Sequence, residues 1–149
     1  MKLPIHAAAG CIALLTVSTF WTSTVLSELF GSHATIAAVK QAILWGMLIL
    51  IPAMATAGAT GASLGKGWRL PLIKAKQARM KIIAANGLLI LLPSAIFLAA
   101  RAQAHQFDTV FFAVQALELI AGATNIALLA RSLKDGFALR KRRLTLSAR

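Results

Sequence analysis

The chain consists of four long apolar stretches separated by short segments that hold most of its polar residues. The apolar stretches run approximately over residues 3–30, 33–64, 81–100 and 109–131. A helix needs about 20 residues to cross the hydrocarbon core of a bilayer, and each stretch reaches that length. The stretches are rich in Ala and Leu, lack strict alternation and are far too long for barrel strands. The pattern predicts an all-α membrane protein, with residues 1–149 forming a single antiparallel bundle of four transmembrane helices.

The composition excludes a soluble protein. Apolar residues make up 58% of the 149 residues and charged residues 13%, against roughly 45–50% and about 25% in soluble domains. The mean hydropathy is +0.76. A soluble chain of this length could not cover so much apolar surface with so few charges. Cys11 is the only cysteine, so an intrachain disulfide scaffold is also excluded.

The net charge of +12 comes mainly from two basic segments. Six of the sixteen basic residues lie between Lys66 and Lys81, and seven lie from Arg131 onward. Basic residues that flank membrane spans tend to stay on the cytoplasmic side. We therefore expect both termini to lie in the cytoplasm. Nucleic acid is not expected as a partner, because no aromatic residues are interleaved for base stacking.

Part of this basic charge is expected to lie against the anionic headgroups of the inner leaflet. Residues 137–149 predict a basic cytoplasmic tail that lies along the leaflet as a short amphipathic segment. The basic residues expected at the inner leaflet are Lys74, Lys76, Arg79, Arg140, Lys141, Arg142 and Arg143.

Local signals mark the ends of the predicted helices. Ser32 and Asp108 are expected to N-cap the second and fourth helices. Pro71 suits the start of the third helix, while Gly65 and Gly136 suit the ends of the second and fourth helices.

Small residues and prolines inside the spans predict close packing and bends. Pro52 and Pro93 should kink the second and third helices. A ladder of small residues at every fourth position of the second helix should let a neighbouring backbone approach closely. The ladder consists of Ala53, Ala57, Gly61 and Gly65.

A polar stripe runs along the fourth helix and predicts a polar seam inside the bundle. Its members alternate spacings of 3 and 4 residues, which places them on one face about 100° wide. Asn86 of the third span lies at a depth similar to that of Asn125. The stripe consists of Asp108, Phe111, Gln115, Glu118, Gly122 and Asn125.

Glu118 is an intramembrane carboxylate, which is costly to bury and suggests a functional site. Lys40 is the expected partner. Lys40 lies about 12 Å along its helix from Ser32, and Glu118 lies about 15 Å from Asp108, so the two reach similar depths. The pair is either a proton or ion site or a buried contact that fixes the helix register.

The three histidines offer a further alternative. His33 and His105 share the outer face, where they could hold a b-type haem or join Glu28 and Asp108 around a metal ion. His6, followed four residues later by a glycine, is another candidate for haem ligation. Histidines at helix ends and in loops are also commonly interfacial and unliganded.

The sequence favours a non-enzymatic accessory component whose seam stabilises the bundle or binds a membrane-protein partner or a second copy of the chain. One alternative is a small proton- or ion-coupled transporter that uses Glu118 and Lys40. Another is a b-type haem or quinone-linked electron-transfer protein. An enzyme is less expected, because the glycines between Gly58 and Gly67 lack the phosphate-loop pattern and no catalytic triad or zinc spacing occurs.

Three short motifs carry a resemblance to a known group. They are Ala84–Gly87, Leu117–Asn125 and the pair Asp135 and Gly136. With these motifs the chain resembles uncharacterised bacterial four-span inner-membrane proteins. The resemblance implies a bacterial inner-membrane setting and no particular activity.

Overall fold

The computed structural model describes the backbone of residues 2–65 and 71–147 and the side chains of residues 4–64 and 74–138. It is all-α, as the apolar pattern predicts. Four helical stretches are long and apolar enough to cross a membrane, so the multi-pass architecture is confirmed. The elements are α1 (Lys2–Phe30), α2 (His33–Gly65), α3 (Pro71–Asn86), the π-helical turn η1 (Gly87–Leu91), α4 (Leu92–Gln103) and α5 (Thr109–Ser147).

The third span is built from α3, η1 and α4, which follow one another without a break. It begins at Pro71 rather than near residue 81, because the basic residues of its first turns continue the helix. The π-helical turn comes just before Pro93, which lies in the first turn of α4. Proline has no backbone N–H and cannot donate the usual helical hydrogen bond, which explains why the helix changes to π-helical geometry just before Pro93.

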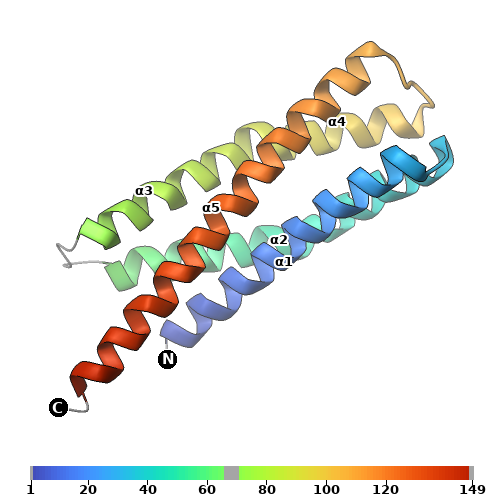
Figure 1. Cartoon of the computed structure of the whole chain (residues 1–149). Coiled ribbons are helices and arrows are strands. Elements are labelled where there is room, and N and C mark those ends of the chain that lie inside the picture. The colour runs from blue at the N-terminus through green and yellow to red at the C-terminus, as the bar shows by residue number, and fades with distance from the viewer. Residues whose placement is uncertain (1, 66–70, 148–149) are drawn as a thin grey trace.

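The four spans form an antiparallel bundle (Figure 1). α1 packs against α2 and α5, and the third span also packs against α2 and α5. Among the described residues, the backbones of α2 and α5 do not approach each other, so these two helices are diagonal partners. The starts of α1 and α3 and the ends of α2 and α5 lie at one end of the bundle (Figure 1). Following the expected orientation, we call this the inner end and the opposite one the outer end.

The expected N-caps are present at the outer end. The backbone N–H of Thr35 donates to Ser32 Oγ at 3.2 Å, and that of Phe111 donates to Asp108 Oδ1 at 2.9 Å. Each contact satisfies a backbone donor that the first helical turn leaves unpaired.

The prediction that the fourth helix ends at Gly136 is wrong, because α5 continues to Ser147. One glycine inside a helix costs only about 1 kcal/mol, and the helix-forming residues on both sides outweigh that cost. The missing side chain instead makes room for a neighbour. A Cβ atom at Gly136 would lie 3.3 Å from Lys76 Nζ. The segment expected to form a separate tail is therefore a continuation of α5, and its side chains beyond residue 138 lie outside the described ones.

The small-residue face of α2 packs against α1. Ala53 and Ala57 are buried, and a Cβ atom at Gly61 would lie 3.0 Å from the His6 ring. Gly46, further toward the outer end, is covered by the ring of Phe20. Gly65 falls outside the described side chains. Close approach of α1 and α2 thus depends on positions where α2 carries little or no side chain.

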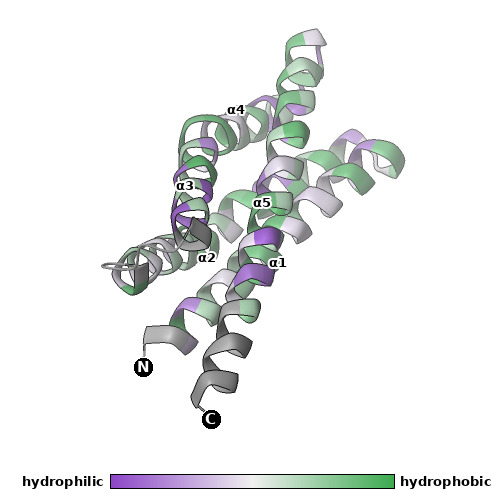
Figure 2. Ribbon diagram, turned by 60° about the vertical axis from the view of Figure 1, so that its left-hand side comes forward, coloured by the Kyte–Doolittle hydropathy of each residue, from purple (hydrophilic) through white to green (hydrophobic). Residues whose placement is uncertain are grey.

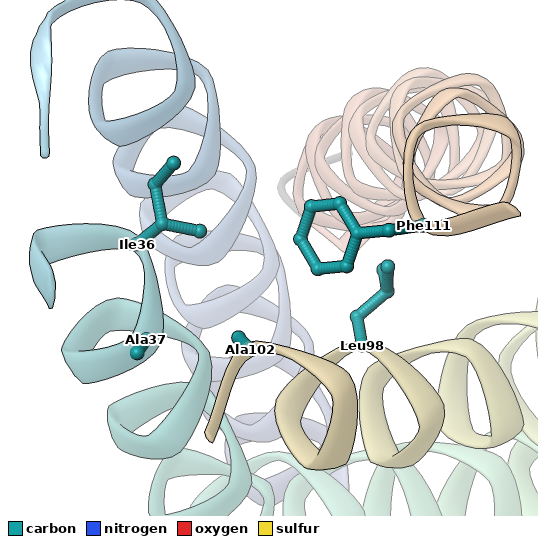
Figure 3. Close-up of a cluster of buried hydrophobic side chains, with 5 residues drawn as sticks. All are labelled: Ile36, Ala37, Leu98, Ala102 and Phe111. Atoms are coloured by element: carbon teal, nitrogen blue, oxygen red, sulfur yellow. The ribbon is translucent and has the colours of Figure 1, made fainter. Parts of the chain in front are cut away.

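A compact apolar core closes the outer end of the bundle (Figure 3). Phe111 of α5 points between α2 and α4 and is fully buried. Large apolar side chains such as Leu29, Leu48 and Leu89 are instead exposed on the outside, and apolar residues are frequent along the described helices (Figure 2). The core consists of Ile36, Ala37, Leu98, Ala102 and Phe111.

Candidate functional site: a charged cluster inside the bundle

Lys40 and Glu118 form an ion pair inside the bundle. Lys40 Nζ lies 2.6 Å from Glu118 Oε2, and the two side chains are 1% and 13% exposed. The amide of Gln115, one turn earlier on α5, donates to the same carboxylate oxygen at 3.1 Å. The carboxylate is therefore bonded to one cation and one neutral donor, which offsets part of the cost of burying it.

The pair spans the bundle axis. Lys40 lies on α2 and Glu118 on α5, and these helices are diagonal partners in the bundle. Their side chains can meet only by reaching inward from opposite sides. The contact therefore fixes the rotation of both helices about their own axes, as a buried pair that sets the register would do.

A third charged residue belongs to the same site. Glu28, in the last turns of α1, lies near enough to Lys40 and Glu118 for their charges to act on its carboxyl group. Within the described part of the chain, Glu28 Oε1 and Gln115 Oε1 are buried and have no hydrogen-bond partner. We call Glu28, Lys40, Gln115 and Glu118 the charged cluster.

The charged cluster holds one basic group and two carboxyl groups. If both carboxyl groups are ionised, these four residues carry a net charge of −1; the His33 ring also lies close enough for its charge to act on Glu28. Buried charges are stable only when they are paired or neutralised. The lysine already pairs with Glu118, so Glu28 is the member whose charge lacks a direct partner among the described residues.

A small cavity lies on the inner side of this cluster. It has a volume of about 50 Å³ and is lined by residues of α1, α2, η1 and α5, with Glu118 contributing its one carboxylate. The indole N–H of Trp21 donates to the Leu119 carbonyl oxygen at 2.9 Å beside the cavity. Gly122 makes room for that indole ring, since a Cβ atom there would lie 3.0 Å from it. The cavity has the volume of a few water molecules, but its lining is mainly apolar, so Glu118 and Thr24 are the side chains able to bond water there.

Two amide side chains form a second polar layer nearer the inner end. Asn86 Nδ2 donates to Asn125 Oδ1 at 2.8 Å and to the Ala121 carbonyl oxygen at 2.9 Å. Asn125 is buried, and its own amide donates to the Ile83 carbonyl oxygen at 3.4 Å. These bonds join α5 to the third span where α3 passes into η1. The predicted seam residues Asn86 and Asn125 thus contact each other.

A third polar layer lies at the inner end. The His6 ring bonds through Nδ1 to the Ala57 carbonyl oxygen at 3.0 Å. Arg79 of α3 forms an ion pair with Asp135 of α5, and Lys76 of α3 extends toward Gly136. The face of α5 that carries the seam therefore continues inward beyond the six residues of the predicted stripe.

The outer-face metal site considered as one alternative is not formed. The charges of Lys40, Glu118 and His33 act on the Glu28 carboxyl group, whereas Asp108 caps α5 and pairs with Arg101 at 3.2 Å. The His33 ring stacks on Phe107 with 4.1 Å between the ring centroids. In the part of the chain that the structure describes, no three His, Cys, Asp or Glu side chains gather closely enough to hold a metal ion.

Haem ligation by His33 and His105 stays a prediction. His105 lies in the exposed loop between α4 and α5 and has a positive φ of 54°. His6 bonds to a backbone carbonyl of α2 through one ring nitrogen. His105 and His6 therefore lie in different environments, an exposed loop and a contact between α1 and α2.

The basic residues expected at the inner leaflet fall into two groups. Lys74 is exposed on α3, but Lys76 and Arg79 turn toward α5. The side chains of residues 140–143 lie outside the described ones. Ser132 and Asp135, which sequence reasoning did not select, belong to the same inner layer. The signal for Ser132 was the continued alternation of 4 and 3 residues beyond Asn125.

Comparison of the chain with family models, with curated proteins and with solved structures finds no match. The resemblance to bacterial four-span inner-membrane proteins thus stays a prediction, and the assignment of function rests on the geometry of the charged cluster.

Proposed function

We propose that this protein is a small proton-coupled membrane carrier in which the charged cluster binds and releases the coupling proton. The observation that carries the proposal is the second carboxylate. Glu28 Oε1 is buried and has no hydrogen-bond partner among the described residues, beside a lysine that already pairs with Glu118.

A purely structural ion pair needs one carboxylate for each ammonium group. The charged cluster has two, and the additional one is costly to keep ionised inside a membrane. A proton bound by Glu28 or shared with Glu118 makes the cluster neutral. Release of that proton leaves a net negative charge that favours uptake of another proton or cation.

The position of the cluster suits exchange with water at the outer face. Glu28 lies two residues before the end of α1 at Phe30, which is about 3 Å along the helix. The cavity on the other side of Glu118 has a mainly apolar lining and leads from the carboxylate toward the middle of the membrane. A proton that enters at Glu28 would need a water molecule or a side-chain movement to reach Glu118, because among the described residues only Lys40 and Gln115 bond directly to the Glu118 carboxylate.

A second candidate is the non-enzymatic accessory component that the sequence favoured. It is supported by the length of α5, which continues as a helix to Ser147, past the apolar stretch of the sequence that ends near residue 131. This extension carries the basic residues 140–143. A helix that projects past the bilayer in this way would offer a surface to a partner protein.

Proton flux in liposomes tests the first proposal. The purified protein is reconstituted with a pH-sensitive dye inside the vesicles, and a membrane potential of either sign is imposed. We expect flux above that of empty liposomes for the unchanged protein and its loss in Glu28→Gln, which keeps the size of the side chain and removes the charge.

Thr19→Val is the matched control on the same helix. Thr19 faces outward, and its hydroxyl bonds only to the backbone of its own helix at 2.9 Å. This variant should keep the full flux. Equal flux in Glu28→Gln and the unchanged protein, or no flux above empty liposomes in any preparation, would contradict the proposal. A partner that co-purifies only while the end of α5 is present would instead support the accessory role.

A further inference from the structure

The inner end of the bundle encloses a second, smaller cavity. Its volume is about 20 Å³, which is enough for about one water molecule or one oxygen atom. All four spans contribute to its lining, so it lies on the bundle axis. The lining residues are His6, Gly10, Ala57, Lys76, Met80, Leu129, Ser132 and Leu133. We call this cavity the inner mouth.

Lys76 brings a positive charge to the inner mouth. Its ammonium group extends past α5 through the space that Gly136 leaves open. The nearby carboxylate of Asp135 is already bonded to Arg79. In the part of the chain that the structure describes, Lys76 has no ion-pair partner, although its side chain is only partly exposed. The charge of Asp135 acts on Lys76 from nearby, but the two form no direct ion pair, so the half-buried ammonium group favours contact with a further anion.

Ser132 supplies a hydroxyl group to the same cavity. The residue is 5% exposed, and among the described residues its Oγ atom is buried without a hydrogen-bond partner. A buried hydroxyl with no partner loses about 1–3 kcal/mol relative to one that is bonded. An acceptor atom placed in the inner mouth would therefore gain a hydrogen bond from Ser132 as well as the charge of Lys76.

The depth of the inner mouth matches a layer of lipid phosphates. Ser132 lies 24 residues after Asp108, which is about 36 Å along α5. The hydrocarbon core is about 30 Å thick, and the bilayer with its headgroups is about 40–45 Å thick. If Asp108 lies at the outer boundary, Ser132 lies within the inner headgroup region. Exposed apolar side chains at the same end, Ile5 and Phe137, offer contacts for acyl chains.

We propose that the inner mouth binds the phosphodiester group of an anionic phospholipid from the inner leaflet. The small volume admits a single phosphate oxygen, which would accept from Ser132 Oγ and pair with Lys76. The proposal favours an anionic lipid because a choline or ethanolamine cation would meet Lys76 and Arg79, while Asp135 is already paired. This proposal of a lipid site does not depend on the proton-coupled function proposed above.

Native mass spectrometry of the full chain in detergent tests this site. The probes are phosphatidylglycerol, phosphatidylcholine with the same acyl chains, and inorganic phosphate. We expect phosphatidylglycerol to bind most tightly and Lys76→Met to weaken its binding at least fivefold. Lys74→Met removes the same charge from an exposed position two residues away, and it should leave the affinity within twofold.

Three other outcomes of the lipid-binding measurement would overturn the proposal. Equal weakening by Lys74→Met and Lys76→Met would overturn the site and indicate diffuse attraction to basic charge. Binding of inorganic phosphate as tight as that of the lipid would overturn the lipid as the source of the phosphate. If Lys76→Met does not fold, the test uses Ser132→Ala instead. An unchanged affinity of that variant for phosphatidylglycerol would overturn the proposal.

Discussion

Removing the ammonium group of Lys40 gives the sharpest test of the charged cluster. Methionine has nearly the shape of the lysine stem, so Lys40→Met changes the charge and leaves most of the packing in place. Lys40 is 1% exposed and touches Glu118 at 2.6 Å. The variant therefore leaves the Glu118 carboxylate without its cation, while the charge of Glu118 still acts on Glu28.

The cost of this change can be bounded. Leaving one partner of a buried pair alone costs about 3–5 kcal/mol. The glutamate can escape part of that cost by taking a proton from water. With a reference pKa of about 4.3, protonating a glutamate in solution at pH 7 costs about 3.7 kcal/mol. We therefore expect Lys40→Met to lower the free energy of unfolding by about 3–4 kcal/mol at pH 7.

The same reasoning gives the direction of the pH dependence. The cost of supplying the proton falls by about 1.4 kcal/mol for each unit that the pH is lowered. At pH 5 the loss of stability in Lys40→Met should shrink to about 1 kcal/mol. The folded variant then binds more protons than the unfolded chain, so the variant becomes relatively more stable as the pH falls.

Unfolding by sodium dodecyl sulfate in mixed micelles, followed by circular dichroism, measures this difference. Lys74→Met controls for the loss of one positive charge and should change stability by less than about 0.5 kcal/mol, because Lys74 is exposed. The double variant Lys40→Met, Glu118→Gln should be more stable at pH 7 than Lys40→Met alone. A loss below about 1 kcal/mol that does not change between pH 5 and pH 7 would refute the reasoning.

Two further substitutions test the packing and the helix ends. Gly46→Ala should lower the free energy of unfolding by about 1–3 kcal/mol, because the new Cβ atom would lie 2.4 Å from the Phe20 ring. The control Gly58→Ala places its methyl group in open space and should be neutral or slightly stabilising. Equal stability of the two variants in the same unfolding assay would contradict the close α1–α2 contact. Asp108→Ala removes the acceptor of the Phe111 N–H bond and should cost about 1 kcal/mol. Hydrogen exchange should then speed up in the first turn of α5, and an unchanged exchange rate there would count against the cap.

The spans and the helix caps follow from signals that act along the chain. Apolar length alone predicts four membrane helices, and Ser32 and Asp108 cap their helices through bonds within three residues. The contact between Lys40 and Glu118 follows from a count of depth, because both helices start at the same end of the bundle. These features need no knowledge of how the helices are rotated against one another.

The remaining features depend on that rotation. Lys74 and Lys76 are two residues apart on α3, yet one is exposed and the other lines the inner mouth. Glu28 lies near the outer end of α1, where the sequence suggested a metal ligand, but the packing of α1 places it close enough to Lys40 and Glu118 for their charges to act on it. Glycine is typical of helix ends, but Gly136 lies inside α5, where the missing side chain makes room for Lys76. Tertiary packing decides each of these cases.

The polar layers of α5 recur every seven residues, at Glu118, Asn125 and Ser132. Seven residues cover about 10.5 Å along a helix, which is more than three times the length of a hydrogen bond. A proton therefore cannot pass from one layer to the next by direct hydrogen bonds in this conformation. The step from Glu118 inward needs water in the cavity beside it or movement of a neighbouring helix.

The π-helical turn η1 is where such a movement would act first. Its first residue, Gly87, lies beside the Asn125 amide, with 3.8 Å between the position of a Cβ atom and Nδ2, and its last residue, Leu91, lines the cavity next to Glu118. One short segment thus touches both the charged layer and the amide layer. Wider π turns inside α-helices often accompany functional sites. A carrier would use this turn to connect the two layers, whereas a purely structural seam would hold it fixed through the bond between Asn86 and Asn125.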